Sequence, residues 1–133
     1  MASIIRDIEI DAPAPAVWDA IADFGAVHRR FAPGFVSNVE LVPGGRLVTF
    51  ADGLTVKELF LGRDDERRRL AYSVQSERMS HHSASFEVVE APGGKARLVW
   101  TADVLPDEIA GWLAGRMEEG LKVAAPVVGR VRA

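Results

Sequence analysis

The sequence contains no cysteine among its 133 residues, which excludes disulfide bonds, thiolate metal sites and cysteine nucleophiles. This absence fits a cytoplasmic location, which is our expectation. No run of apolar residues approaches the ~20 that a membrane span needs. Residues 1–11 also lack the apolar core of a secretory signal. We therefore expect neither a membrane span nor a signal peptide.

Histidine is scarce, and positive charge is not in excess. The three histidines, His28, His81 and His82, do not have the spacing of metal ligands, so we expect no metal site. The net charge is −3, whereas a nucleic-acid-binding protein usually presents a basic face. The basic run 67–69 directly follows the acidic run 64–66, a mixture typical of a solvated turn. We expect no nucleic-acid partner.

The composition is that of an ordinary globular protein, with 48% hydrophobic and 26% charged residues. A chain of this length suits a single domain, which we place over residues 1–133. It can bury roughly 65–70% of its unfolded surface, enough for a core without covalent cross-links. There are no internal repeats and no low-complexity segments.

Alternation and turn residues predict seven strands. A β-branched stretch over 3–10 predicts the first, and two short helices follow at about 15–22 and 26–31. Asp52-Gly53 is a strong signal for a tight hairpin. The short spacings favour an antiparallel meander over crossover connections. The six later strands are predicted at Phe35–Val42, Arg46–Phe50, Leu54–Leu61, Arg69–Val74, His82–Val89 and Lys95–Val104.

A long amphipathic helix is predicted from Asp107 to Ala124 or beyond. Acidic residues occupy its first turn, where the helix dipole favours them. Pro126 predicts a kink or an end near Ala125. The chain is thus predicted to be α+β, a seven-stranded antiparallel sheet burying one face against this helix. The apolar stripe of the helix consists of Ile109, Trp112, Leu113, Met117, Leu121 and Ala124.

The whole chain resembles the START/polyketide-cyclase-like superfamily, also called SRPBCC, which includes the birch pollen allergen and the plant abscisic-acid receptors. It is most similar to the bacterial polyketide cyclase/dehydrase and lipid transport type. The order of elements matches, and three groups of residues carry the resemblance. They are Ile10–Pro13 with Val17-Trp18 and Ile21–Phe24; Gly53–Glu58 with Asp64-Asp65 and Tyr72; and Val99-Trp100 with Pro106 and Gly120-Leu121.

The resemblance implies a helix-grip fold, in which the sheet curls around the C-terminal helix and leaves a cavity for a hormone, lipid, quinone or polyketide. Members that catalyse reactions do so without a metal or cofactor, so none is expected here. His28, His82 and Met117 stand where many bacterial relatives carry aromatic residues. These departures alter the expected cavity wall, so the identity of the ligand does not carry over.

Three polar residues are candidates for the cavity. Resemblance to the abscisic-acid receptors aligns Glu58 with a glutamate that faces their pocket; the alternative is an exposed strand glutamate. Arg116 falls near the centre of the helical stripe and would pair with Glu58 or with an acid group of the ligand, unless it extends to the helix flank. His81 and His82 face opposite sides of a strand, and we assign His82 to the cavity rather than to the surface.

The same alternation places further side chains inward. Tyr72 and Trp100 are most simply core aromatics, although a cavity wall would use them equally well. We expect the following residues to line the cavity: Val56, Glu58, Phe60, Tyr72, Val74, His82, Phe86, Trp100, Leu113, Arg116 and Met117.

Two functions are compatible with these residues. The first is binding of an apolar or aromatic small molecule, lipid-, polyketide- or hormone-like, with few polar groups fixing its orientation. The alternative is a cofactor-independent polyketide cyclase or dehydratase, in which Glu58, His82 and Arg116 would be the catalytic residues for acid–base transfer and enolate stabilisation. Fold alone does not separate the two.

Overall fold

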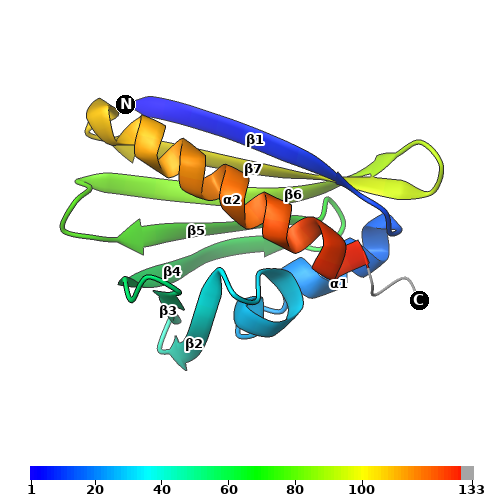
Figure 1. The fold of residues 1–133 in the computed structure, drawn as a ribbon, viewed down its shortest axis with the longest axis horizontal. Coiled ribbons are helices and arrows are strands. Elements are labelled where there is room, and N and C mark those ends of the chain that lie inside the picture. Colours follow the sequence, from blue (N-terminus) through cyan, green and yellow to red (C-terminus); the bar gives the residue numbers. More distant parts are fainter. Residues whose placement is uncertain (130–133) are drawn as a thin grey trace.

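The computed structural model describes residues 1–129, and these form one antiparallel seven-stranded sheet curled around a long C-terminal helix (Figure 1). The predicted helix-grip fold is confirmed. The strand order is β1-β7-β6-β5-β4-β3-β2. Along the chain the elements are β1 (Ala2–Ile10), α1 (Ala14–Ala22), η1 (Val27–Phe31), β2 (Val36–Val42), β3 (Gly45–Phe50), β4 (Thr55–Asp64), β5 (Arg69–Gln75), β6 (His81–Ala91), β7 (Lys95–Leu105), η2 (Asp107–Ile109) and α2 (Ala110–Gly129).

Glycines with positive φ form the tight turns between the strands. Gly53 has a φ of 91°, which glycine adopts without strain. Asp52 Oδ1 accepts a hydrogen bond of 3.0 Å from the backbone N–H of Leu54, which closes the β3–β4 hairpin. Gly44, in the β2–β3 turn, also has a positive φ, of 74°. The predicted antiparallel meander from β2 to β7 is therefore confirmed, and β1 joins it by pairing with β7.

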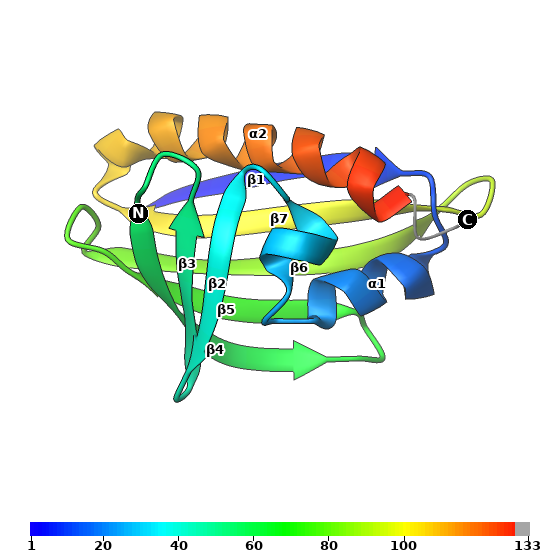
Figure 2. The same cartoon turned by 60° about the horizontal axis from the view of Figure 1, so that its bottom comes forward.

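One face of the sheet is buried, and it is the concave one. In β6 the alternate residues His82, Ala84, Phe86 and Val88 are buried, whereas their neighbours are more exposed. Leu98, Ala102 and Val104 of β7 are buried in the same way. The helix α2 lies over this face along β1 and β7, and α1 lies near its C-terminal end (Figures 1 and 2). Within residues 1–129 no helix is long and apolar enough to cross a membrane.

The helix α2 begins later than predicted, at Ala110, and it continues past Pro126 to Gly129. The stretch from Asp107 forms the 3₁₀ turn η2 before α2 starts at Ala110. Of the two outcomes predicted for Pro126, a kink or an end near Ala125, the end was wrong, because α2 continues to Gly129. A proline removes one helical hydrogen bond, here to the carbonyl of the exposed Lys122. The buried Val128 packs the last turn against the core, which offsets this loss.

Candidate ligand-binding cavity

Two adjoining cavities lie between the concave face of the sheet and α2. The first has a volume of about 60 Å³ and the second of about 50 Å³. Each exceeds the roughly 10–15 Å³ that a cavity needs to hold a water molecule. Five residues line both and so form the wall between them: Phe35, Phe50, Glu58, Tyr72 and Trp100.

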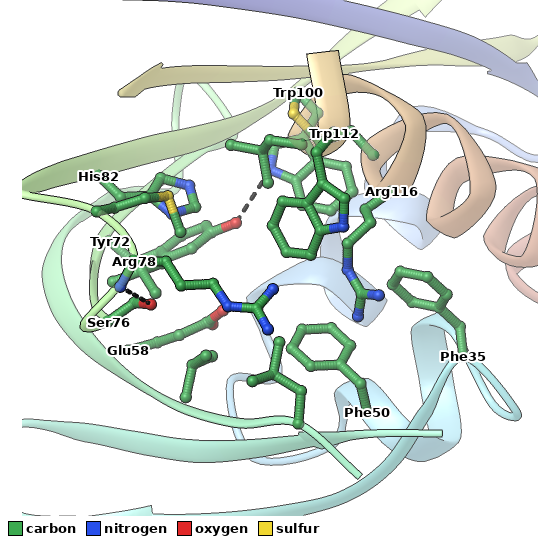
Figure 3. Close-up of a pocket in the computed structure, with 16 residues that line it drawn as sticks. Phe35, Phe50, Glu58, Tyr72, Ser76, Arg78, His82, Trp100, Trp112 and Arg116 are labelled. Atoms are coloured by element: carbon green, nitrogen blue, oxygen red, sulfur yellow. Dashed lines mark hydrogen bonds between the residues drawn. The ribbon is translucent and has the colours of Figure 1, made fainter. Parts of the chain in front are cut away.

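Most of the predicted residues lie at these cavities. Phe86 lines the second cavity, on the side toward α1 and η1. The first cavity, shown in Figure 3, lies toward the start of α2 and the β5–β6 turn. Its predicted lining residues are Val56, Glu58, Tyr72, Val74, His82, Trp100, Leu113, Arg116 and Met117.

Phe60 does not line either cavity, which corrects the prediction. It pairs with Tyr72 across β4 and β5 and so has the expected phase. However, the residue is 44% exposed, and its ring packs edge-on against Phe24, with 5.6 Å between centroids. Phe60 is the next residue after Glu58 on the inner face of β4. At this point the sheet is covered by the segment that follows α1, and not by α2.

Glu58 is paired with Arg46, which was not among the predicted site residues. Arg46 Nε and Nη2 lie 2.8 and 2.7 Å from Glu58 Oε1, and the two residues are only 3% and 7% exposed. The alternative of an exposed Glu58 was therefore wrong, and so was its pairing with Arg116. Both interactions use Oε1, and within residues 1–129 no hydrogen bond is found to Oε2. That oxygen is left to accept a hydrogen bond from a ligand.

Backbone geometry fixes this ion pair in place. The register of β3 and β4 sets Arg46 directly opposite Glu58. Gly45 permits the close pairing, since a Cβ there would lie 2.2 Å from the carbonyl oxygen of Glu58. Arg46 Nη1 donates to the carbonyl oxygen of Phe24 at 2.8 Å, and the guanidinium lies 3.9 Å from the centroid of the Phe24 ring. Each of the three guanidinium nitrogens therefore lies within hydrogen-bonding distance of a protein acceptor.

Aromatic side chains form the inner wall. Trp100 Nε1 donates a hydrogen bond of 3.0 Å to the hydroxyl of Tyr72. Phe86 stacks on Trp100, with 4.7 Å between ring centroids. Burial, and secondarily the charge of Glu58, raises the pKa of Tyr72 far above its ordinary value. Tyr72 therefore remains a neutral phenol that can donate its own proton in a hydrogen bond.

His82 lies on the inner face of β6 at the first cavity. Its Nδ1 is buried and has no hydrogen-bond partner among the described residues. Burial, and secondarily the neighbouring His81, lowers the pKa of His82 to about 4, so the ring is neutral at pH 7. His81 faces outward, with Nε2 lying 3.0 Å from Ser83 Oγ. Nowhere in residues 1–129 do three potential metal ligands gather.

Arg116 reaches the cavity from α2. Its guanidinium lies 4.7 Å from the ring centroid of Phe50 and 5.1 Å from that of Trp112. Its charge partner is Asp52 in the β3–β4 turn, with 3.1 Å between Nη1 and Oδ2. With 19% of its side chain exposed, Arg116 does not extend into solvent along the helix flank. Trp112 of the apolar helical stripe also lines this cavity, as do Phe35, Phe50 and Arg78, which were not among the predicted residues.

Comparisons with known proteins agree with this geometry. Residues 1–129 match the model of a family described as polyketide cyclase / dehydrase and lipid transport. A protein of Thermobifida fusca, solved by NMR in solution, is 31% identical, with a TM-score of 0.79 over 98% of this chain and 95% of that chain. An uncharacterised protein of Bacillus thuringiensis is 20% identical, with a TM-score of 0.85 over 96% of this chain and 98% of that chain.

The Zhui aromatase/cyclase of Streptomyces sp. R1128 shares the fold, with a TM-score of 0.73, 21% identity and coverage of 98% of this chain and 93% of that chain. No curated protein matches. The family match spans nearly the whole sequence and includes every residue that lines the two cavities. The chain belongs to the polyketide cyclase / dehydrase and lipid transport family.

Proposed function

We propose that the protein binds an apolar or aromatic small molecule, lipid-, polyketide- or hormone-like, between the sheet and α2. The observation that carries this proposal is the pair of adjoining cavities, lined mainly by aromatic and aliphatic side chains with a few polar atoms among them. Glu58 Oε2, the hydroxyl of Tyr72 and the ring of His82 are the polar groups available to orient such a molecule.

The small volume of each cavity restricts how a ligand enters. A molecule with two fused rings exceeds either cavity alone, so the wall between them must yield. Phe35 and Phe50 are the movable part of that wall, because both are only half-buried. Tyr72 is held by Trp100 and Glu58 by Arg46, so these residues remain in place. Displacement of the two phenylalanines would join the cavities into one.

Native mass spectrometry of freshly purified protein tests this proposal. We expect an additional mass that disappears on denaturation in organic solvent and that chromatography of the extract identifies as an apolar compound. A titration with an aromatic library, followed by tryptophan fluorescence, is the second measurement, since Trp100 and Trp112 both line the first cavity. Neither a bound mass nor a fluorescence change with any compound would contradict the proposal.

A cofactor-independent cyclase or dehydratase is the second candidate, favoured by proton-handling groups meeting at one cavity. Glu58 and His82 would transfer protons, and Arg116 would stabilise an enolate. The low pKa of His82 weakens this candidate, because a general base works best with a pKa near the operating pH. His82→Gln distinguishes the two: turnover of a polyketide substrate would fall about 10²–10⁴-fold in an enzyme, whereas a carrier shows only a modest change in affinity.

A further inference from the structure

Two arginines flank one tryptophan at the opening of the first cavity. The guanidinium of Arg116 lies 5.1 Å from the ring centroid of Trp112, and that of Arg78 lies 5.6 Å from the same ring. Figure 3 shows both guanidinium groups pointing into the space beside this ring. We call Asp52, Arg78, Trp112 and Arg116 the cavity mouth.

The positive charge at the mouth exceeds what the protein itself neutralises. Asp52 pairs with Arg116, but within residues 1–129 Arg78 has no ion pair with any carboxylate. Glu119 lies on the outer side of Asp52 and Arg116, and it forms no ion pair with either arginine among the described residues. Among the described residues Asp52 is the one acidic partner of the two arginines, and its side chain is 54% exposed.

The surroundings of Arg116 suit a planar acid group. Phe35, Phe50 and Trp112 lie within 5.5 Å of its guanidinium and exclude water from much of it. A partly desolvated guanidinium binds a carboxylate more strongly than a fully hydrated one, through two parallel hydrogen bonds. Because Asp52 is exposed, it can return to water at little cost and be replaced.

The charged groups in the interior of the cavity determine which end of such a ligand faces inward. Arg46 already pairs with Glu58 and donates to the carbonyl oxygen of Phe24, so its charge is neutralised and it attracts an acid group deep in the cavity less strongly than an unpaired arginine does. The free oxygen of Glu58 would repel a second carboxylate there. The acid end of a bound molecule is therefore more stable at the mouth than in the interior, with its apolar body inside.

We propose that the ligand carries a carboxylate, which lies at the cavity mouth between Arg78 and Arg116 and replaces Asp52 as the partner of Arg116. This inference rests on the proposed binding function, and it narrows the ligand class to apolar or aromatic monocarboxylates. Without a ligand, Asp52 pairs with Arg116 and partly neutralises the charge at the mouth. When a ligand binds, Asp52 competes with its carboxylate for Arg116.

Matched acids and alcohols test the charge of the ligand. We use 2-naphthoate with 2-naphthalenemethanol, and decanoate with decanol, titrated into the full chain by calorimetry. We expect at least one acid to bind about tenfold more tightly than its alcohol at low salt, as a charge-assisted hydrogen bond provides. Sodium chloride should reduce the advantage of the acid and leave the alcohol unaffected.

Variants of the mouth assign the effect to its residues. Asp52→Asn should tighten binding of the acid about 3- to 10-fold, because it removes the competitor, and should not change binding of the alcohol. Arg116→Gln should abolish the advantage of the acid, and Arg78→Gln should reduce it about 3-fold. Arg67→Gln removes the same charge from an exposed residue in the β4–β5 turn, and should change neither affinity.

The results distinguish failure of the carboxylate assignment from failure of the proposed binding function. If the alcohols bind as tightly as the acids, or if Asp52→Asn leaves the acid-to-alcohol ratio unchanged, the carboxylate assignment is wrong while the binding function stands. If no member of either pair binds, both are overturned. Because Asp52 is exposed, we expect Asp52→Asn to fold normally. Its acid-to-alcohol affinity ratio therefore tests the inference even if Arg116→Gln unfolds.

Discussion

At the scale of single residues, the ion pair of Arg46 and Glu58 is buried, so the loss of either partner should be costly. Glu58→Gln leaves a guanidinium charge buried with no counter-ion, and we expect a loss of about 3–5 kcal/mol in the free energy of unfolding. Urea denaturation at pH 7 measures it. The double variant Arg46→Met, Glu58→Leu should recover most of this loss, since two apolar residues leave no unpaired charge.

An exposed pair provides the control for that measurement. Arg97 Nη1 and Asp7 Oδ1 form an ion pair between β7 and β1, with both side chains more than 40% exposed. Asp7→Asn should lower stability by less than about 1 kcal/mol. If Glu58→Gln had as small an effect as Asp7→Asn, the Arg46–Glu58 pair would not contribute to stability as we describe.

His82 makes stability depend on pH. Between pH 6.5 and about 4 the unfolded chain takes up a proton at this residue, whereas the folded protein does not. Stability is therefore fully present above pH 6.5 and is lost as the pH falls toward 4, by an amount of order 2–3 kcal/mol. Urea midpoints across this range should fall less steeply for His82→Gln than for the wild type.

His81→Gln is the matched control for that experiment. It removes an exposed neighbouring histidine and should keep the steep pH dependence of the wild type. Acidic groups that titrate in the same range affect the wild type and both variants alike. Differences between their plots of urea midpoint against pH therefore arise from the histidines. Identical slopes for His82→Gln and His81→Gln would mean that His82 is protonated in the folded protein.

The partner of Glu58 could have been predicted from the sequence, but that of Arg116 could not. In a hairpin closed by Asp52-Gly53, pairing Val48 with Val56 sets Arg46 opposite Glu58, and the structure has this register. Counting from the turn requires only local geometry. Arg116 meets Asp52 because the sheet curls until the turn reaches α2, and curl depends on how the whole core packs.

At the scale of elements, the glycines of α2 decide how closely the helix approaches the cavity wall. A Cβ at Gly120 would lie 3.2 Å from Phe35 and 3.3 Å from Trp100, whereas one at Gly115 meets nothing within 4 Å. Gly120→Leu should push these two rings into the cavities, lower stability by roughly 1–3 kcal/mol and weaken ligand binding. Gly115→Leu should do neither. Thermal unfolding and ligand titration check both, and equal effects would show that α2 does not bound the cavities.

The element order and the seven strands were predictable because alternation and turn glycines are local signals. The errors lie where a neighbouring element decides the outcome. Phe60 has the phase that alternation predicts, yet the chain after α1 covers it and α2 does not. Pro126 should end a helix by local rules, but the buried Val128 holds one more turn against the core.

At the scale of the whole molecule, the two halves of the sheet differ in how completely their strands are paired and buried. β6 and β7 pair along their full lengths, from His81 and Leu105 to Ala91 and Lys95, and their inner faces are buried. β2 forms one edge of the sheet, and most of its residues are exposed. We expect amide hydrogen exchange to be slowest in β6 and β7 and fastest among the strands in β2.

Ligand binding should change that pattern at the cavity wall and spare β1. Among the strands, the lining residues of the two cavities come from β2 to β7 and not from β1, so exchange should slow around them and remain unchanged in β1. Mass spectrometry of exchanged peptides, with and without the bound compound, measures this. Equal slowing across all seven strands would indicate a global gain in stability instead of a local one at the cavity wall.

The pairing of β1 with β7 has a consequence for how the chain is made. Ser3 and Asp103 are neighbours in the finished sheet although 100 positions separate them. At the usual rates of translation, β1 leaves the ribosome roughly 5–20 s before its partner. During that interval Ile4 and Ile8 have no strand or helix to cover them. The nascent protein thus carries an unpaired, partly apolar strand until β7 has been made, and during that time chaperone binding or aggregation would compete with closure of the sheet.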